Sequence, residues 1–422
     1  MTIETLLSNA KSTFDLREPS HQESLYALAE ALLEMSNLNS EDLHRVGRRS
    51  DTPLEFKIAV KLVDSRQYLL KTQTPLNIGV VYAMWGEHNR LLPKSKSNPN
   101  GEDSLRTKIR QLDWVTEDTP IDWTLYVADD GCPHASGKIA IQVTDSHPLK
   151  NKVKVLFLND AVPTQNGPLR ELRSADDSRK AGAIILGCMH AITDGKDAVI
   201  YTDADNSVHL GQIGLLLRPF IEDNCRVVLG NRKHPDAVLV KEEGRWGIGI
   251  KLLRHMQRMV AQAIISRNIL DTQAAFKLYE RSLLRKIIAN PTVFDFSFDT
   301  DWLLATIRME EPFKQVPFAF IDSFAESASI TQGSMTTWET LLMGLVKAVR
   351  RHQIPHNEEM ARVLKAEIHS SADLDILIHH LPPELIEADA SALGDPALMS
   401  PEAVQAWIQK LKAEASADLK KA

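Results

Sequence analysis

Two aspartates one residue apart are the part of this sequence best suited to chemistry. Asp203 and Asp205 follow the apolar run Ala198 to Tyr201, which has the length and composition of a buried strand. Two carboxylates at the end of a strand repel each other unless a cation lies between them. Hard divalent ions such as Mg²⁺ are usually held by one or two carboxylates together with phosphate oxygens. The pair therefore predicts a metal-bridged phosphate site, and an ordinary solvated turn is the competing interpretation.

A second acidic pair suits a nucleotide. Asp129 and Asp130 follow another apolar run, and Gly131 after them permits a tight turn. A carboxylate in this position can accept a hydrogen bond from a base N–H or a ribose hydroxyl. An ordinary Asp-Asp-Gly turn is the favoured interpretation of the segment when it is taken alone.

A basic segment opens the helix expected before Asp203. Arg179 and Lys180 stand there beside small residues, and a helix N-terminus favours an anion. Their positive charge suits a diphosphate, although a solvated basic turn is the alternative. Three features suited to phosphate or nucleotide thus occur in order at successive junctions of strand and helix, which favours a shared site.

The elements that must position these residues alternate between strand and helix. Such alternation predicts an α/β fold with a mostly parallel sheet and helices on both faces. In an open sheet of this kind, ligands bind at the carboxyl ends of the strands. The expected strands lie at 78–82, 123–128, 153–158, 198–201 and 226–229, and the expected helices at 103–115, 179–192 and 210–220.

The regions that flank this alternation are helical. Residues 1–74 and 334–422 carry apolar stripes at helical spacing, whereas 75–333 holds the expected sheet. The sequence therefore predicts a central domain between two helical extensions. These extensions serve packing or the formation of a homo-oligomer.

Composition and charge exclude several classes. The chain of 422 residues has a net charge of −7, which argues against general nucleic-acid binding. Its three cysteines (Cys132, Cys188 and Cys225) have no CxxC spacing, which favours a reducing compartment without structural zinc. No run approaches the length of a membrane span, and no signal-peptide pattern opens the chain. The sequence predicts a cytoplasmic protein without a transmembrane segment.

Several motifs stand in a fixed order between residue 76 and about residue 350. The most specific are Thr202-Asp-Ala-Asp205 and Asp271-Thr-Gln-Ala-Ala-Phe-Lys-Leu-Tyr279. Together with Val127-Ala-Asp-Asp-Gly131, Arg179-Lys-Ala-Gly-Ala183 and Phe298-Asp-Thr-Asp-Trp-Leu303, they resemble family 2 glycosyltransferases of the GT-A fold. Among these, the dolichyl-phosphate sugar synthase group is the most similar in motif.

The resemblance implies an activity and a set of ligands. It implies a glycosyltransferase that moves a sugar from a UDP- or GDP-sugar to a hydroxyl or phosphate acceptor. Asp203 and Asp205 would hold Mg²⁺ or Mn²⁺. Gly86 replaces the family's Asn, and Cys132 replaces its Ser. The donor nucleotide would be bound by Glu87, Asp129, Asp130, Arg179, Lys180 and Asp203.

A hydroxyl acceptor also needs a general base. Asp271 is the first candidate and Asp301 the second, and both can instead position substrate or cap a helix. If the acceptor were an ionised phosphate, no base would be required.

Two other classes compete with an active transferase. A catalytically decayed GT-A domain would act as a nucleotide-binding or scaffold protein. A haloacid-dehalogenase-like phosphatase would use Asp203 as its nucleophile, but its loop lies near the start of the domain, and here three strand-like runs precede it.

Overall fold

The computed structural model of the chain describes residues 2–35, 39–241, 247–322 and 334–419. These residues divide into two compact units, and each unit is described by itself. The first contains Met1–Lys241, Ala274–Thr292 and Pro312–Glu326, and the second contains Glu242–Gln273, Val293–Glu311 and Ser327–Ala422. The three regions expected from the sequence stay a prediction, and the boundary at residue 333 lies outside the described residues.

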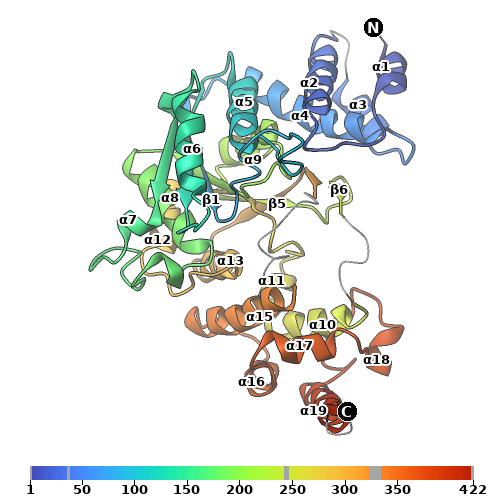
Figure 1. Ribbon diagram of the computed structural model, residues 1–422. Coiled ribbons are helices and arrows are strands. Elements are labelled where there is room, and N and C mark those ends of the chain that lie inside the picture. Colours follow the sequence, from blue (N-terminus) through green and yellow to red (C-terminus); the bar gives the residue numbers. More distant parts are fainter. Residues whose placement is uncertain (1, 36–38, 242–246, 323–333, 420–422) are drawn as a thin grey trace. The chain divides into compact units, whose positions relative to one another are not determined.

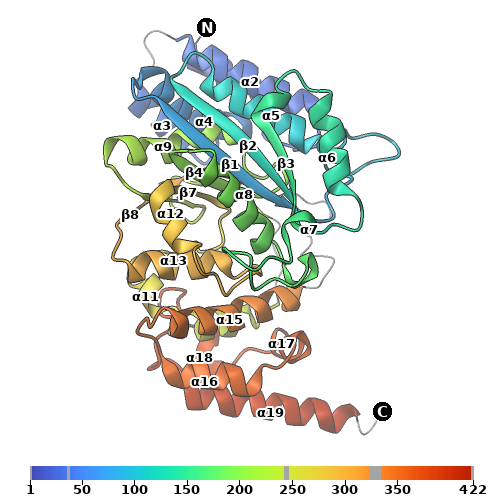
Figure 2. The same cartoon turned by 90° about the vertical axis from the view of Figure 1, so that its left-hand side faces the viewer.

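A seven-stranded sheet forms the centre of the first unit, in the order β3-β2-β1-β4-β7-β5-β8 (Figures 1 and 2). Strands β1 to β4 are parallel, and β7 runs antiparallel to its neighbours β4 and β5. From β1 the chain continues to β2 and β3 on one side, and it then crosses to β4 on the other side of β1. The carboxyl ends of β1 and β4 therefore mark the switch point, where ligands bind in such sheets. The strands are β1 (Leu76–Met84), β2 (Ile121–Asp129), β3 (Val153–Phe157), β4 (Ala198–Thr202), β5 (Val227–Asn231), β7 (Phe276–Glu280) and β8 (Phe313–Pro317).

Helices cover both faces of this sheet, which is why its inner strands read as nearly continuous apolar runs. Helices α5 (Ser104–Thr116), α6 (Ser136–Asp145) and α9 (Ile213–Glu222) pack on one face, and α8 (Ala181–Thr193) and α12 (Arg281–Ile287) pack on the other. Gly187 lets α8 lie close to β1, because a Cβ there would come within 2.4 Å of Val81 Cγ1. The expected α/β class with a mostly parallel sheet is confirmed.

The N-terminal helices belong to the first unit. They are α1 (Ile3–Asn9), α2 (Pro19–Leu33), α3 (Ser40–Gly47) and α4 (Leu54–Lys71). Helix α4 packs against α2, α5 and α9. The apolar stripe of Leu25, Leu28 and Leu32 is buried in a core that it shares with Phe56 and Val63. These apolar side chains therefore serve packing within the unit, and association through the helical extensions stays a prediction.

Short elements complete the first unit. The strands β6 (Val238–Val240) and β9 (Ala319–Ile321) form a parallel pair of their own. The others are η1 (Lys150–Lys152), α7 (Leu158–Ala161), η2 (Ala175–Asp177) and η3 (Leu210–Gln212).

The second unit is helical in its described residues, as expected for the C-terminal region. None of the helices described in either unit is both long and apolar enough to cross a bilayer. The second unit contains α10 (Ile250–Val260), α11 (Gln262–Ile265), α13 (Phe298–Arg308), α15 (Ser334–Arg351), α16 (Glu358–Glu367), α17 (Ser371–Leu377), α18 (Pro383–Ile386) and α19 (Pro401–Leu419).

Candidate active site

The carboxyl ends of β1, β2 and β4 bring most of the predicted site residues into one region of the first unit. Glu87 lies just after β1, Asp130 just after β2, and Asp203 and Asp205 just after β4. A hydrogen bond of 2.9 Å from Asp130 N to Met84 O joins the ends of the first two strands. The parallel pairing of β1 with both neighbours therefore places three acidic loops at the switch point.

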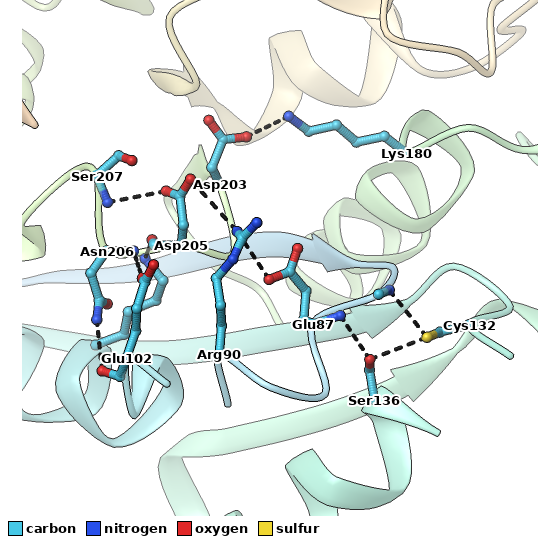
Figure 3. Close-up of polar contacts among 12 residues, drawn as sticks. Glu87, Arg90, Glu102, Cys132, Ser136, Lys180, Asp203, Asp205, Asn206 and Ser207 are labelled. Atoms are coloured by element: carbon cyan, nitrogen blue, oxygen red, sulfur yellow. Dashed lines mark hydrogen bonds and ion pairs between the residues drawn. The ribbon is translucent and has the colours of Figure 1, made fainter. Parts of the chain in front are cut away.

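A buried arginine links two of these loops. Figure 3 shows Arg90 between Glu87 and Asp205. Its Nη1 lies 3.1 Å from Glu87 Oε2 and 3.8 Å from Asp205 Oδ2, and the residue is 4% exposed. Burial raises the pKa of Glu87 to about 7, against the opposing effect of the Arg90 charge. The positive charge of Arg90 is thus shared between a carboxylate after β1 and one of the metal-motif carboxylates.

The turn that carries Asp205 is held from the segment between β1 and β2. The fully buried Lys108 donates to the backbone carbonyl of Asp205 at 2.5 Å. Glu102 accepts from Asn206 N at its carboxylate and from Asn206 Nδ2 at its carbonyl, both at 3.0 Å. Asp205 Oδ1 accepts from Ser207 N at 3.0 Å. These bonds hold the backbone of the turn, so its shape does not depend on the Asp205 side chain alone.

Lys180 reaches the other metal-motif carboxylate. Its Nζ lies 2.5 Å from Asp203 Oδ1 (Figure 3). Burial alone would raise the pKa of Asp203, but the charge and hydrogen bond of Lys180 hold it below its ordinary value. Lys180 directly precedes α8 and has a φ of 82°, a conformation that is uncommon for a residue with a side chain. The N-terminal end of α8 is therefore shaped so that a cation lies beside Asp203.

Asp130 holds the same helix end to β2. It accepts from Ser178 Oγ and from Lys180 N, both at 2.6 Å. Burial raises the pKa of Asp130 to about 6, although these two bonds favour its ionised form. Near neutral pH the carboxylate is ionised and can accept a further hydrogen bond from a ligand.

Asp129 is bound to the backbone of its own loop. Its Oδ1 accepts from Cys132 N at 2.9 Å and its Oδ2 from Gly137 N at 2.7 Å. A Cβ at Gly137 would lie 2.9 Å from that second oxygen, so the close approach needs glycine. Asp129 thus orders the loop between β2 and α6, and its predicted contact with the nucleotide stays a prediction. Arg179 is exposed.

The two catalytic candidates lie in the other unit. Asp271 and Asp301 both belong to the second unit and are buried there. Asp301 forms an ion pair with Arg351 at 3.0 Å, and its Oδ1 lies 2.8 Å from His352 Nε2. Its carboxylate is therefore already engaged within the second unit.

Sequence reasoning missed Arg90, Glu102, Lys108 and Asn206. Only Lys108 carried a signal, because it falls on the apolar face of its helix, three residues after Leu105. A lysine at a core position needs a partner when the helix packs. That partner is a backbone carbonyl, which no side-chain pattern reveals.

The donor set fits a hard divalent ion that also takes phosphate ligands. Among the described residues, no group of three or more His, Cys, Asp or Glu side chains could hold a metal. Asp203 and Asp205 supply two carboxylates, and one oxygen of each is bonded to Lys180 or Ser207. Mg²⁺ suits such a site, because it is usually bound by one or two carboxylates, with water and substrate phosphates as its other ligands.

Residues 102–288 match the model of glycosyl transferase family 2. The chain carries a family 2 glycosyltransferase domain. This glycosyltransferase is 23% identical over 285 residues to dolichyl-phosphate beta-glucosyltransferase of Drosophila melanogaster, covering 65% of this chain and 74% of the relative. The predicted family and its enzyme class are confirmed.

Solved structures of glucosyl-3-phosphoglycerate synthase from Mycobacterium tuberculosis are similar to the glycosyltransferase at a lower level. The complex with Mn²⁺, UDP and glucosyl-3-phosphoglycerate has a TM-score of 0.44 and 15% identity, covering 70% of this chain and 85% of that one. The complex with Mn²⁺, UDP-glucose and phosphoglyceric acid has a TM-score of 0.45, with the same identity and coverage. This level of likeness carries no residue role over to this chain.

The raised pKa of Glu87 makes stability depend on pH. The pKa of Glu87 is about 7 in the folded protein and 4.5 ordinarily, so the folded state favours the protonated carboxyl. The stability that this protonation gives is fully present below about pH 4.5 and is lost as the pH rises through about 7. Glu87→Gln stays neutral at every pH. Its free energy of unfolding relative to that of the parent should therefore rise by about 3 kcal/mol between about pH 4.5 and pH 8. Urea unfolding of both proteins at pH 4.5 and pH 8 measures this, with the exposed Glu41→Gln as control. A difference that does not change with pH would contradict it.

Proposed function

We propose that this glycosyltransferase moves a sugar from a nucleotide-diphosphate donor to a hydroxyl or phosphate acceptor, with the donor at the carboxyl ends of β1, β2 and β4. One observation carries the proposal. Asp130, Lys180, Asp203 and Asp205 converge there within the first unit. The arrangement offers an acceptor of hydrogen bonds for a nucleoside, a cation for phosphate and two carboxylates for a metal ion.

The carboxylates of Asp203 and Asp205 would hold Mg²⁺ or Mn²⁺. When bound, the ion would act as a Lewis acid that stabilises the negative charge developing on the leaving diphosphate. Lys180 holds Asp203 ionised and places an ammonium group at the same point. Asp130 is fixed by Ser178 and by the backbone of Lys180, so a base or ribose that bonds to it would be oriented relative to the diphosphate.

Nucleotide binding can be tested by thermal unfolding. We expect one of UDP and GDP, or its sugar conjugate, to stabilise the protein with Mn²⁺ and to lose that effect with EDTA. A ligand that binds only the folded state at 100 times its Kd contributes about 2.7 kcal/mol. Nucleoside monophosphates, which lack the diphosphate, serve as controls. No stabilisation by any nucleotide with metal would contradict the proposed donor site.

Asp271 stays the first candidate for the general base, because it opens the more specific of the two motifs, Asp271 to Tyr279. The Asp301 carboxylate pairs with Arg351 and His352, and both candidates are buried, Asp271 at 3% and Asp301 at 2% exposure. We expect Asp271→Asn to lower kcat by about 100-fold or more and to change donor Kd little, because general-base catalysis contributes typically 10²–10⁴-fold. Single-turnover rates and donor titrations separate the two quantities. An equal loss in both would assign Asp271 to donor positioning.

The decayed-domain alternative finds no support. The acidic pair after β4 is present, and hydrogen bonds to Lys108, Lys180 and Ser207 keep it ordered. The sugar acceptor, a cytoplasmic location and association into a homo-oligomer stay predictions.

A further inference from the structure

A cleft lies in the first unit and shares no residue with the candidate active site. It has a volume of about 1060 Å³. Its walls come from α3, α4, α9, the segment 235–240 that includes β6, and the end of β8. Leu215, Ile221, Val238, Leu239 and Val316 supply apolar surface. Ligand sites are usually concave and mostly apolar, with a few placed polar groups.

A row of lysines runs along one wall. Lys57, Lys61 and Lys71 line the cleft from α4. At 100° per residue their positions fall on one face of the helix, and the rise from the first lysine to the last is about 21 Å. None of the three ammonium groups makes a hydrogen bond or ion pair with another residue in the parts of the chain that the structure describes.

The remaining charges of the cleft are paired with one another. Arg48 donates to both carboxylate oxygens of Asp236, at 2.7 and 2.9 Å. Arg218 pairs with Glu222 at 3.0 Å, and His44 lies 2.6 Å from Asp64. The acidic side chains of the cleft therefore already have basic partners. The three lysines remain as excess positive charge in the cleft, although the whole chain has a net charge of −7.

Lys61 is the most enclosed of the three. Burial lowers its pKa, and the negative charges of Asp64 and Asp236 oppose this only in part. An anion brought against the ammonium group would restore part of the interaction that burial removes. The wall thus favours an acidic ligand, and its length exceeds the reach of a single phosphate.

Strand β6 adds a row of backbone groups. Val238 N donates to Phe318 O at 3.1 Å, and Val240 O accepts from Asp322 N at 2.8 Å. These two residues direct their peptide groups toward β9, so the N–H and C=O of Leu239 between them point to the opposite edge. Side chains alternate between the two faces of a strand, and all three residues of β6 line the cleft. The cleft therefore runs along the other edge of β6, which no strand of the described residues pairs with.

We propose that this cleft binds an extended acidic segment of a partner polypeptide, which adds as a strand to the free edge of β6. Such a segment gains backbone hydrogen bonds from the edge and specificity from alternate side chains. About six extended residues match the length of the lysine row, since each spans about 3.3 Å. Carboxylates on every second residue would lie over the lysines, and apolar side chains between them would meet the opposite wall. The inference does not depend on the proposed donor site.

Fluorescence anisotropy with a labelled Glu-Val-Glu-Val-Glu-Val peptide tests the proposal on the full chain. We expect saturable binding that weakens at least 10-fold in Lys57→Glu/Lys61→Glu and weakens as salt is raised. We also expect Leu239→Pro to weaken binding by a similar factor, because proline removes the outward N–H while leaving the bonds to β9 in place. Leu239→Ala keeps that N–H and is the matched control, with a smaller loss expected.

A second experiment, on the unaltered protein, tests the backbone pairing if Leu239→Pro is poorly folded. A peptide of the same sequence, N-methylated at every residue, has no N–H to donate to the edge and should bind at least 10-fold more weakly to the unaltered protein. Equal affinity for the methylated peptide or for Lys-Val-Lys-Val-Lys-Val would overturn the proposal. So would binding of inorganic tripolyphosphate without binding of the acidic peptide, which would assign the cleft to a small polyanion.

Discussion

Asp205→Ala is expected to lower kcat/KM by more than 100-fold at any metal concentration while the protein stays folded. Removing even the outer partners of a metal site typically costs 10–100-fold, and Asp205 is proposed to bind the ion directly. The fold should persist, because Lys108 bonds to the backbone carbonyl of Asp205 and Glu102 bonds to Asn206. The turn therefore keeps its main supports when the carboxylate is gone.

Initial rates measured across a Mn²⁺ titration, with the donor nucleotide that stabilises the parent, check this expectation. Asp122→Ala is the matched control, since that aspartate lies on β2 and pairs with Lys152 at the surface. Thermal unfolding without metal should give similar values for the parent and for both variants. Full activity of Asp205→Ala without added metal would remove Asp205 from the proposed metal site.

Arg90→Met has the second largest expected effect, and it acts on both stability and rate. The substitution leaves Glu87 and Asp205 in a buried region without the cation that lies within 4 Å of both. Breaking a buried ion pair by removing one partner typically costs 3–5 kcal/mol, so we expect a loss of about 3 kcal/mol. The displaced Asp205 carboxylate should also lower kcat/KM and raise the metal concentration needed for half-maximal rate.

A double variant separates charge from shape in this effect. Glu87→Gln/Arg90→Met removes the charge that Arg90 neutralises, and it should recover part of the stability lost in Arg90→Met. The exposed Arg45→Met, whose arginine pairs with Asp42 at the surface, should change stability by less than about 1 kcal/mol. If Arg90→Met unfolds with the same free energy as the parent, Arg90 does not neutralise these carboxylates.

Several strands were predictable because their sequence and their environment agree. Strand β4 is buried at every position, so its residues read as an uninterrupted apolar run. Strand β7 was not predicted, because Lys277 interrupts its apolar pattern. That lysine is fully buried, donates to Ala274 O at 2.5 Å and lies over the Tyr201 ring. These partners come from tertiary contacts, which a local pattern does not contain.

The departures from the family pattern also have local explanations. Gly86, which replaces Asn, has a φ of +75°, a region that glycine enters freely and asparagine more readily than most residues. Cys132, which replaces Ser, donates its N–H to Asp129 and accepts from Gly86 N at its sulfur. Each replacement therefore remains compatible with the loop conformation at its position.

The sequence by itself determined the class of the fold, the family and the acidic residues at the ends of β2 and β4. Those properties depend on local composition and on short motifs, and chain order carries both. Only the tertiary structure decided how the acids are held: Arg90 between Glu87 and Asp205, Lys180 on Asp203, and Asp129 bound to its own loop. These choices depend on burial and on backbone groups brought together by strand pairing, and such contacts between distant segments leave no spacing in the sequence.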